Sequence, residues 1–430
     1  MHYFSTNRTS PHVSFGQAVL NGQPDDKGLY FPSEIPKLSA DFLAGFRSIS
    51  NAQIAFDVIR PYIGGEIPDE ELFNICAETV NFEFPLVPIT DRISTLELFH
   101  GPTLAFKDVG ARFMSRCLGY FSRGNKEKTI VIVATSGDTG GAVAAGFHGV
   151  EDIEVVILYP KGKVSKVQEL QLTTLGGNVT TLELHGNFDD CQALAKKALA
   201  DADLQTKVNL TSANSINVAR WLPQQFYYFY ALKHWEGEPP FISVPSGNFG
   251  NLASGILAHI SGLPVAKFIA ACNANDVVPR FLQSENYEPR ESVATLSNAM
   301  DVGSPSNFVR ILEIFDNKFV DLKEKLESVS ISDETTAATM LDVYSQCNYI
   351  LDPHGAVGFR ALDDYLKHHE NSKGIVLETA HPVKFDSVTD ILGTQGDVPA
   401  DVSELFNKEK VSIEMENDYG RLKEILVTKI

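Results

Sequence analysis

One lysine stands out because of its neighbours. Lys107 lies in the stretch HGPTLAFKDVG, residues 100–110, directly after Leu104, Ala105 and Phe106. A lysine normally keeps its ammonium group in water, and burial of an unpaired ammonium is costly. Lys107 is therefore either an ordinary surface lysine on a turn or an amine held in a pocket to do chemistry. One lysine among apolar residues does not decide between the two.

A glycine-rich turn at residues 243–255, SVPSGNFGNLASG, is the first candidate for an anion site. An apolar strand runs into the turn at 247–251, and a helix follows. Glycines let the backbone N–H groups converge, and the helix N-terminus adds partial positive charge. The loop lacks the lysine of a Walker loop, so a phosphomonoester fits better than a magnesium-bound triphosphate. A plain strand-to-helix turn is an equally open interpretation.

A second such turn, ATSGDTGG at residues 134–141, adds the hydroxyl groups of Thr135, Ser136 and Thr139. Hydroxyl and N–H donors at a helix start suit a carboxylate or a phosphate. A nicotinamide site would need G-x-G-x-x-G and an acidic residue at the end of the next strand. The glycine spacing differs, and the next strand ends in Leu-Tyr-Pro (158–160), so the dinucleotide interpretation fails.

Asn214, Ser215 and Arg220 lie near the start of another predicted helix, in NSINVAR. Arginine makes forked contacts to phosphate, and two small polar donors would support it. A helix cap with a surface arginine is the alternative. His354 and His381 lack the acidic or histidine partners of a metal site, so we expect structural or supporting roles for them and no metal. The serine-hydrolase pattern G-x-S-x-G is absent from the sequence.

These residues follow apolar, β-branched runs that alternate with helical patterns, which predicts parallel sheets in an α/β protein. The predicted strands are 129–134, 154–159, 178–184, 241–247, 267–272 and 374–380. A long helical segment, 214–235, divides them into two clusters and so predicts two α/β lobes. Ligands bind beyond the carboxyl ends of such strands, where the glycine turns fall. Residues 1–95 show short helical patterns and turns.

Charge and composition narrow the class of protein. The formal charge of −19 in 430 residues, with 43% hydrophobic residues, is typical of a globular protein that does not bind nucleic acid, although a locally basic pocket could still take a small anion. Five scattered cysteines without a CxxC pair favour a reducing compartment. The start of the sequence lacks a signal-peptide pattern, and no apolar run approaches ~18 residues. We therefore expect a cytoplasmic protein without a membrane partner.

An isolated lysine, a lysine-free phosphate turn and a hydroxyl-bearing loop together indicate pyridoxal-phosphate (PLP) chemistry. At this level the sequence also resembles the threonine synthase family, in its longer bacterial and fungal branch, within the fold type II (tryptophan-synthase-β-like) PLP enzymes. The stretches that carry the resemblance run in the family's order along nearly the whole chain: GLYFPSEIP (28–36), ELFHGPTLAFKD (97–108), TSGDTG (135–140), VVILYPKGKVS (155–165), TSANSIN (211–217), SVPSGNFGN (243–251), TLSNAMDVGSPSN (295–307) and TAHPVKF (379–385).

The resemblance implies roles around the cofactor. Lys107 would hold PLP as a Schiff base and shuttle protons. Thr379 would face the pyridine nitrogen, and Asp138 would lie near the 3′ oxygen, where relatives often have asparagine. The turn around the cofactor phosphate would comprise Gly247, Asn248, Phe249, Gly250 and Asn251.

It also implies roles around the substrate. Thr135 and Ser136 would bind its carboxylate. Its phosphate would be bound by Thr139, Asn214, Ser215 and Arg220. The family converts O-phospho-L-homoserine and water to L-threonine and phosphate, the last step of threonine biosynthesis. No counterpart of the plant branch's S-adenosylmethionine region is found, and Glu378 receives no role.

The implied organisation is two parallel-sheet lobes with an N-terminal helical extension, in a monomer or homodimer. The extension would span 1–95, the large PLP-binding lobe 96–110 and 214–400, the small lobe 111–213, and a C-terminal segment 401–430. Two alternatives remain: another fold type II enzyme, such as a serine/threonine dehydratase or a cysteine synthase, and a catalytically inactive relative that only binds phosphorylated ligands. The first would not need the second phosphate site, and the second would not need Lys107 or Thr379.

Overall fold

The computed structural model describes residues 1–124, 128–394 and 396–429. Its small lobe is built on TIVIVA and the other apolar runs of that region, which form strands buried on both faces. The strands are β5 (Thr129–Ala134), β6 (Ile153–Pro160), β7 (Val179–Leu184), β8 (Asn209–Ser212) and β13 (Ile413–Met415). They pair in the order β13-β7-β6-β5-β8, all parallel. The C-terminal part of the chain thus adds an edge strand to this sheet.

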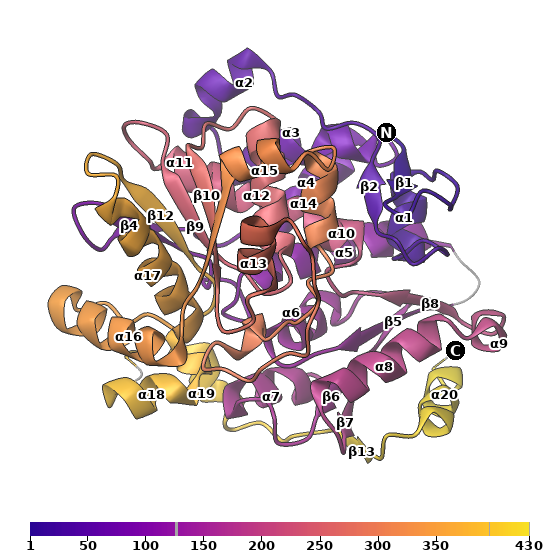
Figure 1. Cartoon of the computed structure of the whole chain (residues 1–430). Coiled ribbons are helices and arrows are strands. Elements are labelled where there is room, and N and C mark those ends of the chain that lie inside the picture. The colour runs from indigo at the N-terminus through magenta and orange to yellow at the C-terminus, as the bar shows by residue number, and fades with distance from the viewer. Residues whose placement is uncertain (125–127, 395, 430) are drawn as a thin grey trace.

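A second sheet of six strands forms the large lobe. Its strands are β3 (Leu86–Pro88), β4 (Ile93–Glu97), β9 (Phe241–Pro245), β10 (Lys267–Cys272), β11 (Leu326–Ser330) and β12 (Gly374–Glu378). The order is β11-β10-β9-β12-β4-β3, parallel except for β3, which runs antiparallel to β4. Every strand predicted from the apolar runs is present, and the two-lobe α/β prediction is confirmed. Figure 1 shows the two sheets on opposite sides of the molecule's centre.

Helices cover both sheets. Around the small lobe these are α6 (Asp138–Phe147), α7 (Lys166–Thr173), α8 (Phe188–Leu199), α9 (Ala202–Gln205) and α20 (Tyr419–Val427). Around the large lobe they are α12 (Gly250–Ile260), α13 (Val277–Ser284), α14 (Phe308–Ile314), α15 (Phe319–Lys325), α16 (Asp333–Cys347), α17 (Pro353–Lys367), α18 (Asp386–Leu392) and the 3₁₀ turns η3 (Asn298–Met300) and η4 (Pro382–Lys384). Two further helices contact the small lobe: α5 (Lys107–Ser122) packs against α6, and α19 (Ala400–Leu405) packs against α7.

The N-terminal region lies at the top and upper right of Figure 1 and contacts elements of both lobes, including α5 and β8. It comprises β1 (Tyr3–Ser5), α1 (Phe15–Asn21), β2 (Tyr30–Pro32), α2 (Ala40–Gly45), η1 (Phe46–Ser48), α3 (Asn51–Ile63) and α4 (Asp69–Thr79). β1 and β2 form an antiparallel pair.

The long helix expected at 214–235 is wrong in detail. The chain forms a turn at 214–217, then α10 (Val218–Trp221), η2 (Leu222–Gln225) and α11 (Phe226–Lys233). Pro223 lacks a backbone N–H and disfavours a continuous α-helix, which explains the 3₁₀ segment between the two helices.

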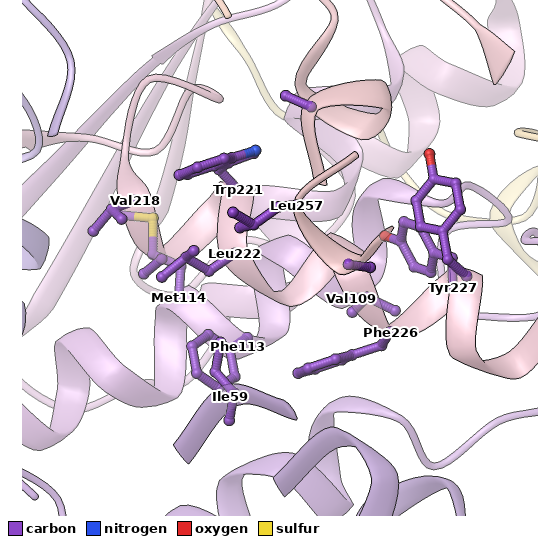
Figure 2. Close-up of a cluster of buried hydrophobic side chains, with 14 of the residues drawn as sticks. Ile59, Val109, Phe113, Met114, Val218, Trp221, Leu222, Phe226, Tyr227 and Leu257 are labelled. Carbon is purple, nitrogen blue, oxygen red and sulfur yellow. The ribbon is translucent and has the colours of Figure 1, made fainter. Parts of the chain in front are cut away.

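A buried apolar cluster supports the segments that carry the candidate site residues. Figure 2 shows Phe113 and Met114 of α5 packed with Trp221, Leu222 and other large side chains, all fully buried. Tight packing of this kind restricts movement of the backbone. The starts of α5 and α10 are therefore held rigidly relative to each other. No helix among the described residues is long and apolar enough to cross a membrane.

Candidate active site

The carboxyl ends of strands from both sheets open into one cavity of about 2200 Å³. Its walls include the segments after β5 and β8 in the small lobe and after β9 and β12 in the large lobe. All fourteen residues predicted to bind the cofactor or the substrate line it: Lys107, Thr135, Ser136, Asp138, Thr139, Asn214, Ser215, Arg220, Gly247, Asn248, Phe249, Gly250, Asn251 and Thr379. The tertiary structure thus brings segments more than a hundred residues apart in the chain to a common space.

Lys107 is the first residue of α5 and is tied to the end of β12. The amide of Phe106 donates to the carbonyl of Thr379 at 2.9 Å, and the hydroxyl of Tyr227 donates to the carbonyl of Phe106. Burial lowers the pKa of Lys107; Asp138 opposes this, while the guanidinium of Arg220 and a further lysine act with burial. Lys107 is therefore an amine in a pocket, biased toward its neutral form.

The turn after β9 leaves a row of amide groups free. Among the described residues, the N–H groups of 247–251 donate to no acceptor. Phe249 has φ +63°, and its ring is buried against the core, so the turn presents backbone to the cavity. A side chain at Gly247 would place its Cβ 2.6 Å from Cα of Met300. Consecutive free N–H groups before a helix N-terminus form an anion site.

The hydroxyl of Thr135 is used inside its own loop. Its oxygen accepts from the amides of Gly137 and Gly140 at 3.0 and 2.9 Å, and it donates to the carbonyl of Gly137. The side chains of Ser136 and Thr139 make no hydrogen bond to the described residues and line the cavity. The loop therefore offers the hydroxyls of these two residues to a ligand, while Thr135 shapes the turn.

Asp138 forms a buried ion pair across the two lobes. Its Oδ1 lies 2.8 Å from Nζ of Lys384 and accepts from Nε2 of Gln168 at 2.9 Å. Burial disfavours ionisation of Asp138, but the ammonium group of Lys384, with smaller contributions from the nearby Lys107 and from the hydrogen bond of Gln168, outweighs burial and lowers the pKa of the carboxyl. Lys384 is completely buried and also donates to the carbonyl of Thr103.

The Lys384→Met variant is expected to lose about 3–5 kcal/mol of unfolding free energy, because it leaves the carboxylate of Asp138 buried without its partner. The double variant with Asp138→Asn should recover most of that loss. Urea titrations of the three proteins measure both values. Lys207→Met, which breaks an exposed pair with Asp203, is the control and should change stability by less than about 1 kcal/mol. Equal losses in the single and double variants would contradict the assignment.

The turn at 214–217 is joined to both lobes. Nδ2 of Asn214 donates to the carbonyl of Ala134 at 3.1 Å, and Nη1 of Arg220 donates to the carbonyl of Ala213 at 2.6 Å. Arg220 is buried, its Nε has no partner among the described residues, and burial lowers its pKa to about 10. An unpaired buried guanidinium beside a cavity favours binding of an anion there.

The turn after β9 and the turn at 214–217 contact each other directly. Nδ2 of Asn248 donates to Oγ of Ser215 at 2.7 Å. Asn251 instead faces its own segment, with Nδ2 donating to the carbonyl of Pro245. The hydroxyl of Thr379 lines the cavity and has no partner in the described part of the chain.

Glu378, to which the sequence assigned no role, belongs to a buried acidic cluster. Its Oε1 accepts from the amide of Asp352 at 2.9 Å, and its Oε2 is buried without a partner. Oδ1 of Asp352 accepts from Nδ1 of His354 at 2.5 Å, and Nε2 of His354 accepts from the amide of Ala299 at 3.1 Å. His354 thus links this cluster to η3. Burial, followed by the nearby carboxylate of Asp352, raises the pKa of Glu378 well above its usual range.

This raised pKa predicts a pH-dependent stability. Folded Glu378 keeps a proton that unfolded Glu378 loses above about pH 4–5, so the free energy of unfolding should fall as the pH rises from there. Glu378→Gln should remove this contribution and make the protein more stable than the wild type near neutral pH. Urea unfolding of both proteins between about pH 5 and 8 tests this, and two parallel curves would contradict it.

His381 has a structural role. Its Nδ1 accepts from the amide of Val383 at 3.1 Å and caps η4, and its ring packs edge-on against Phe99. Burial, and then His100, lower its pKa to about 4. Among the described residues, no group of three or more His, Cys, Asp and Glu side chains is placed to hold a metal ion.

Three buried polar residues that contact cavity-lining residues were not predicted from the sequence: Lys384, Asn307 and Arg310. Each lies in or next to a stretch that carries the family resemblance. A sequence alone does not distinguish a buried lysine, arginine or asparagine from one on the surface. Lys384 directly follows Pro382 and Val383, just as Lys107 directly follows apolar residues. This similarity could have indicated that Lys384 is also buried.

Comparisons with known proteins cover the whole chain. The family described as "Threonine synthase N terminus" matches residues 2–80. The family described as "Pyridoxal-phosphate dependent enzyme" matches 95–378, and the one described as "Threonine synthase, C-terminal" matches 355–426. The threonine synthase of Haemophilus influenzae is 44% identical over 99% of this chain and 100% of its own.

Solved structures agree. Threonine synthase from Escherichia coli superposes with a TM-score of 0.93 at 41% identity and covers 100% of both chains. PLP-bound threonine synthase from Brucella melitensis gives 0.92 at 34% identity, covering 100% of this chain and 99% of its own. The resemblance inferred from the motifs is confirmed. The chain therefore belongs to the threonine synthase family of pyridoxal-phosphate-dependent enzymes.

Proposed function

We propose that the cavity between the lobes is where the chain converts O-phospho-L-homoserine and water to L-threonine and phosphate. The observation that carries the proposal is the position of Lys107, a buried amine with a lowered pKa that faces the same cavity as a row of free backbone amides and the hydroxyl of Thr379. These are the contacts that a carbonyl-bearing, singly phosphorylated cofactor requires.

The residues present fit PLP. The free N–H groups of 247–251 would hold its phosphate, Lys107 would bind its carbonyl carbon covalently, and Thr379 would face its ring nitrogen. Bound PLP supplies an electron sink that allows protons next to an imine-linked amino group to be removed. The paired carboxylate of Asp138 would lie near the 3′ oxygen, with Lys384 balancing its charge.

The substrate would be held at both ends. In this proposal the hydroxyl of Ser136 and the amides of its loop bind the carboxylate, and Thr135 keeps that loop in shape. The substrate phosphate lies against the set predicted from the sequence: Thr139, Asn214, Ser215 and Arg220. Arg220 lines the cavity and would offer its guanidinium to an oxyanion.

Lys107 would move the protons. In this proposal the free amine of Lys107 would accept a proton from Cα of the substrate, and it would have to be neutral to do so. Burial and the neighbouring cations favour the neutral amine, and the ammonium formed on protonation can return the proton at a later step. The backbone hydrogen bond from the amide of Phe106 to the carbonyl of Thr379 fixes the position of Lys107 relative to the end of β12.

The departing phosphate must leave Cγ, and water must arrive at Cβ. Retention of the phosphate by Arg220 and its neighbours would favour addition of water over side reactions, with closure of the lobes excluding bulk solvent. The buried pair of Asp138 and Lys384 is placed to connect the lobes during such a movement.

The division of the chain is also part of the proposal. The N-terminal extension 1–95 supplies β3 and most of β4 to the large sheet, and the segment 401–430 supplies β13 to the small sheet. The large lobe would comprise 96–110 and 214–400, and the small lobe 111–213. We further propose a cytoplasmic enzyme, monomeric or homodimeric, that does not bind nucleic acid, as its charge of −19 favours.

The decisive experiment supplies O-phospho-L-homoserine to the purified holoenzyme and measures L-threonine and phosphate together. Equal molar formation of both products supports the proposal. Faster turnover of serine or threonine without a phosphate would instead favour the dehydratase alternative. Absence of any turnover, with PLP bound, would favour the catalytically inactive relative.

A further inference from the structure

Arg310 is a buried cation without a carboxylate partner among the described residues. It lies on α14, is fully buried, and its Cζ is 4.3 Å from the ring centre of Trp221. Burial lowers its pKa to about 9. Its hydrogen bonds go to four neutral acceptors: the carbonyls of Ser215 (2.9 Å), Ile216 (2.8 Å) and Tyr30 (3.2 Å), and Oδ1 of Asn307 (2.6 Å).

The contact with Arg310 determines which way the amide of Asn307 points. A guanidinium can only donate, so the group of Asn307 that faces Arg310 must be the oxygen. The NH₂ group of Asn307 then points to Oγ of Ser215, at 3.0 Å. Asn307 is completely buried, so it has no water-facing alternative.

Asn248 is oriented in the same way from the other side. Its Oδ1 accepts from the backbone N–H of Ser306 at 2.7 Å, and a backbone N–H can only donate. The NH₂ group of Asn248 therefore also points to Oγ of Ser215, at 2.7 Å.

These two amides leave the hydroxyl of Ser215 a single role. A hydroxyl has two acceptor lone pairs and one proton, and both lone pairs are occupied by N–H donors. The proton has no acceptor among the described residues, and Ser215 lines the cavity. The amides of Ser215 and Ile216 likewise have no acceptor in the described chain, while Arg310 binds their carbonyls.

We propose that Arg310 and Asn307 are positioning residues that make the Ser215 hydroxyl an obligate donor toward the cavity, and so select an anionic, acceptor-only group at this point of the site. This inference rests on the proposed function, which assigns Ser215 to the substrate phosphate. PLP also carries a phosphate. We assign the selection to the phosphate of the substrate because the turn of Ser215 also carries Asn214 and leads directly into α10, which carries Arg220.

Asn307→Asp reverses the hydrogen bond with almost no change of shape. A carboxylate at 307 still accepts from Arg310 and gives that cation a buried partner, so the fold should tolerate it. It also accepts from Ser215, whose proton then turns away from the cavity. We expect the KM for O-phosphohomoserine and the Kd for inorganic phosphate to rise about 10- to 100-fold, with a smaller change in kcat.

The binding measurement uses inorganic phosphate and holoenzyme in calorimetry, and the visible absorption of PLP is recorded for each variant. Asn407→Asp, an exposed isosteric change, controls for the added charge and should leave all values unchanged. Ser215→Ala separates a positioning role of Asn307 from a structural one. If Asn307 acts through the hydroxyl of Ser215, adding Asn307→Asp to the Ser215→Ala variant should raise the Kd for phosphate by less than about threefold.

If Asn307→Asp weakened phosphate binding equally in the wild type and in the Ser215→Ala variant, the inference would be overturned and the proposed function would remain intact. Loss of PLP from Asn307→Asp, with phosphate binding unchanged, would also overturn it, because the selected group would be the cofactor phosphate. If Ser215→Ala alone leaves phosphate binding and KM unchanged, the assignment of Ser215 itself is wrong, and the inference falls with it.

Discussion

Lys107→Met should reduce formation of threonine from O-phosphohomoserine by about 10³-fold or more. The variant keeps the approximate length of the side chain but removes the buried amine that would bind PLP and carry protons. Coupled assays for threonine and phosphate measure the loss. Borohydride treatment should label the wild-type protein at residue 107 and leave the variant unlabelled.

Stability provides the control for this variant. Burial lowers the pKa of Lys107, so the amine is protonated less readily in the folded protein than in the unfolded chain. Lys107 therefore reduces the free energy of unfolding at neutral pH. This reduction grows as the pH falls from about 10 to the pKa of Lys107 in the folded protein, and it is constant below that pKa. The cofactor-free Lys107→Met protein should therefore melt no lower than the cofactor-free wild type at neutral pH. Residual activity within tenfold of the wild type would contradict the assignment.

Arg220→Met should lower kcat/KM for O-phosphohomoserine by about 100-fold or more, while the visible absorption of bound PLP persists. Arg220 lines the cavity and its guanidinium is buried, and loss of one member of a desolvated charge pair costs about 2–5 kcal/mol. The comparison of steady-state kinetics and cofactor spectra for the same preparations separates substrate binding from cofactor binding.

Arg123→Met, which breaks an exposed pair with Glu71, is the matched control and should behave like the wild type. If Arg220→Met lost PLP in proportion to its activity, Arg220 would belong to the cofactor site and the assignment to the substrate phosphate would be wrong. Thr139, Asn214 and Ser215 would then be the remaining donors to the substrate phosphate.

Local patterns were enough to predict the fold class. Continuous apolar runs such as TIVIVA form strands buried on both faces, because only a covered parallel sheet can bury such a run, and each predicted strand is present. Pro223 shows the limit of periodicity: the apolar pattern of 214–235 continues through it, but the missing N–H divides the helix.

The short strand β13 could not be found from the sequence. Its residues Ile413 and Glu414 are exposed and Met415 alone is buried, so the segment has no strand pattern of its own. It becomes a strand because the edge of β7 offers it backbone hydrogen bonds. Such pairing depends on a partner more than two hundred residues away, which a local pattern does not contain.

For the site, the sequence by itself determined which side chains have the chemistry: a lysine for the cofactor carbonyl, glycine turns for phosphate and hydroxyls for a carboxylate. Only the tertiary structure decided how these groups are charged and which way they point. Lys107 is biased toward a neutral amine because folding buries it beside Arg220 and Lys384, and Ser215 must donate because Asn248 and Asn307 occupy its lone pairs. Desolvation and hydrogen-bond direction arise from neighbours distant in the chain, and so they appear only when the chain is folded.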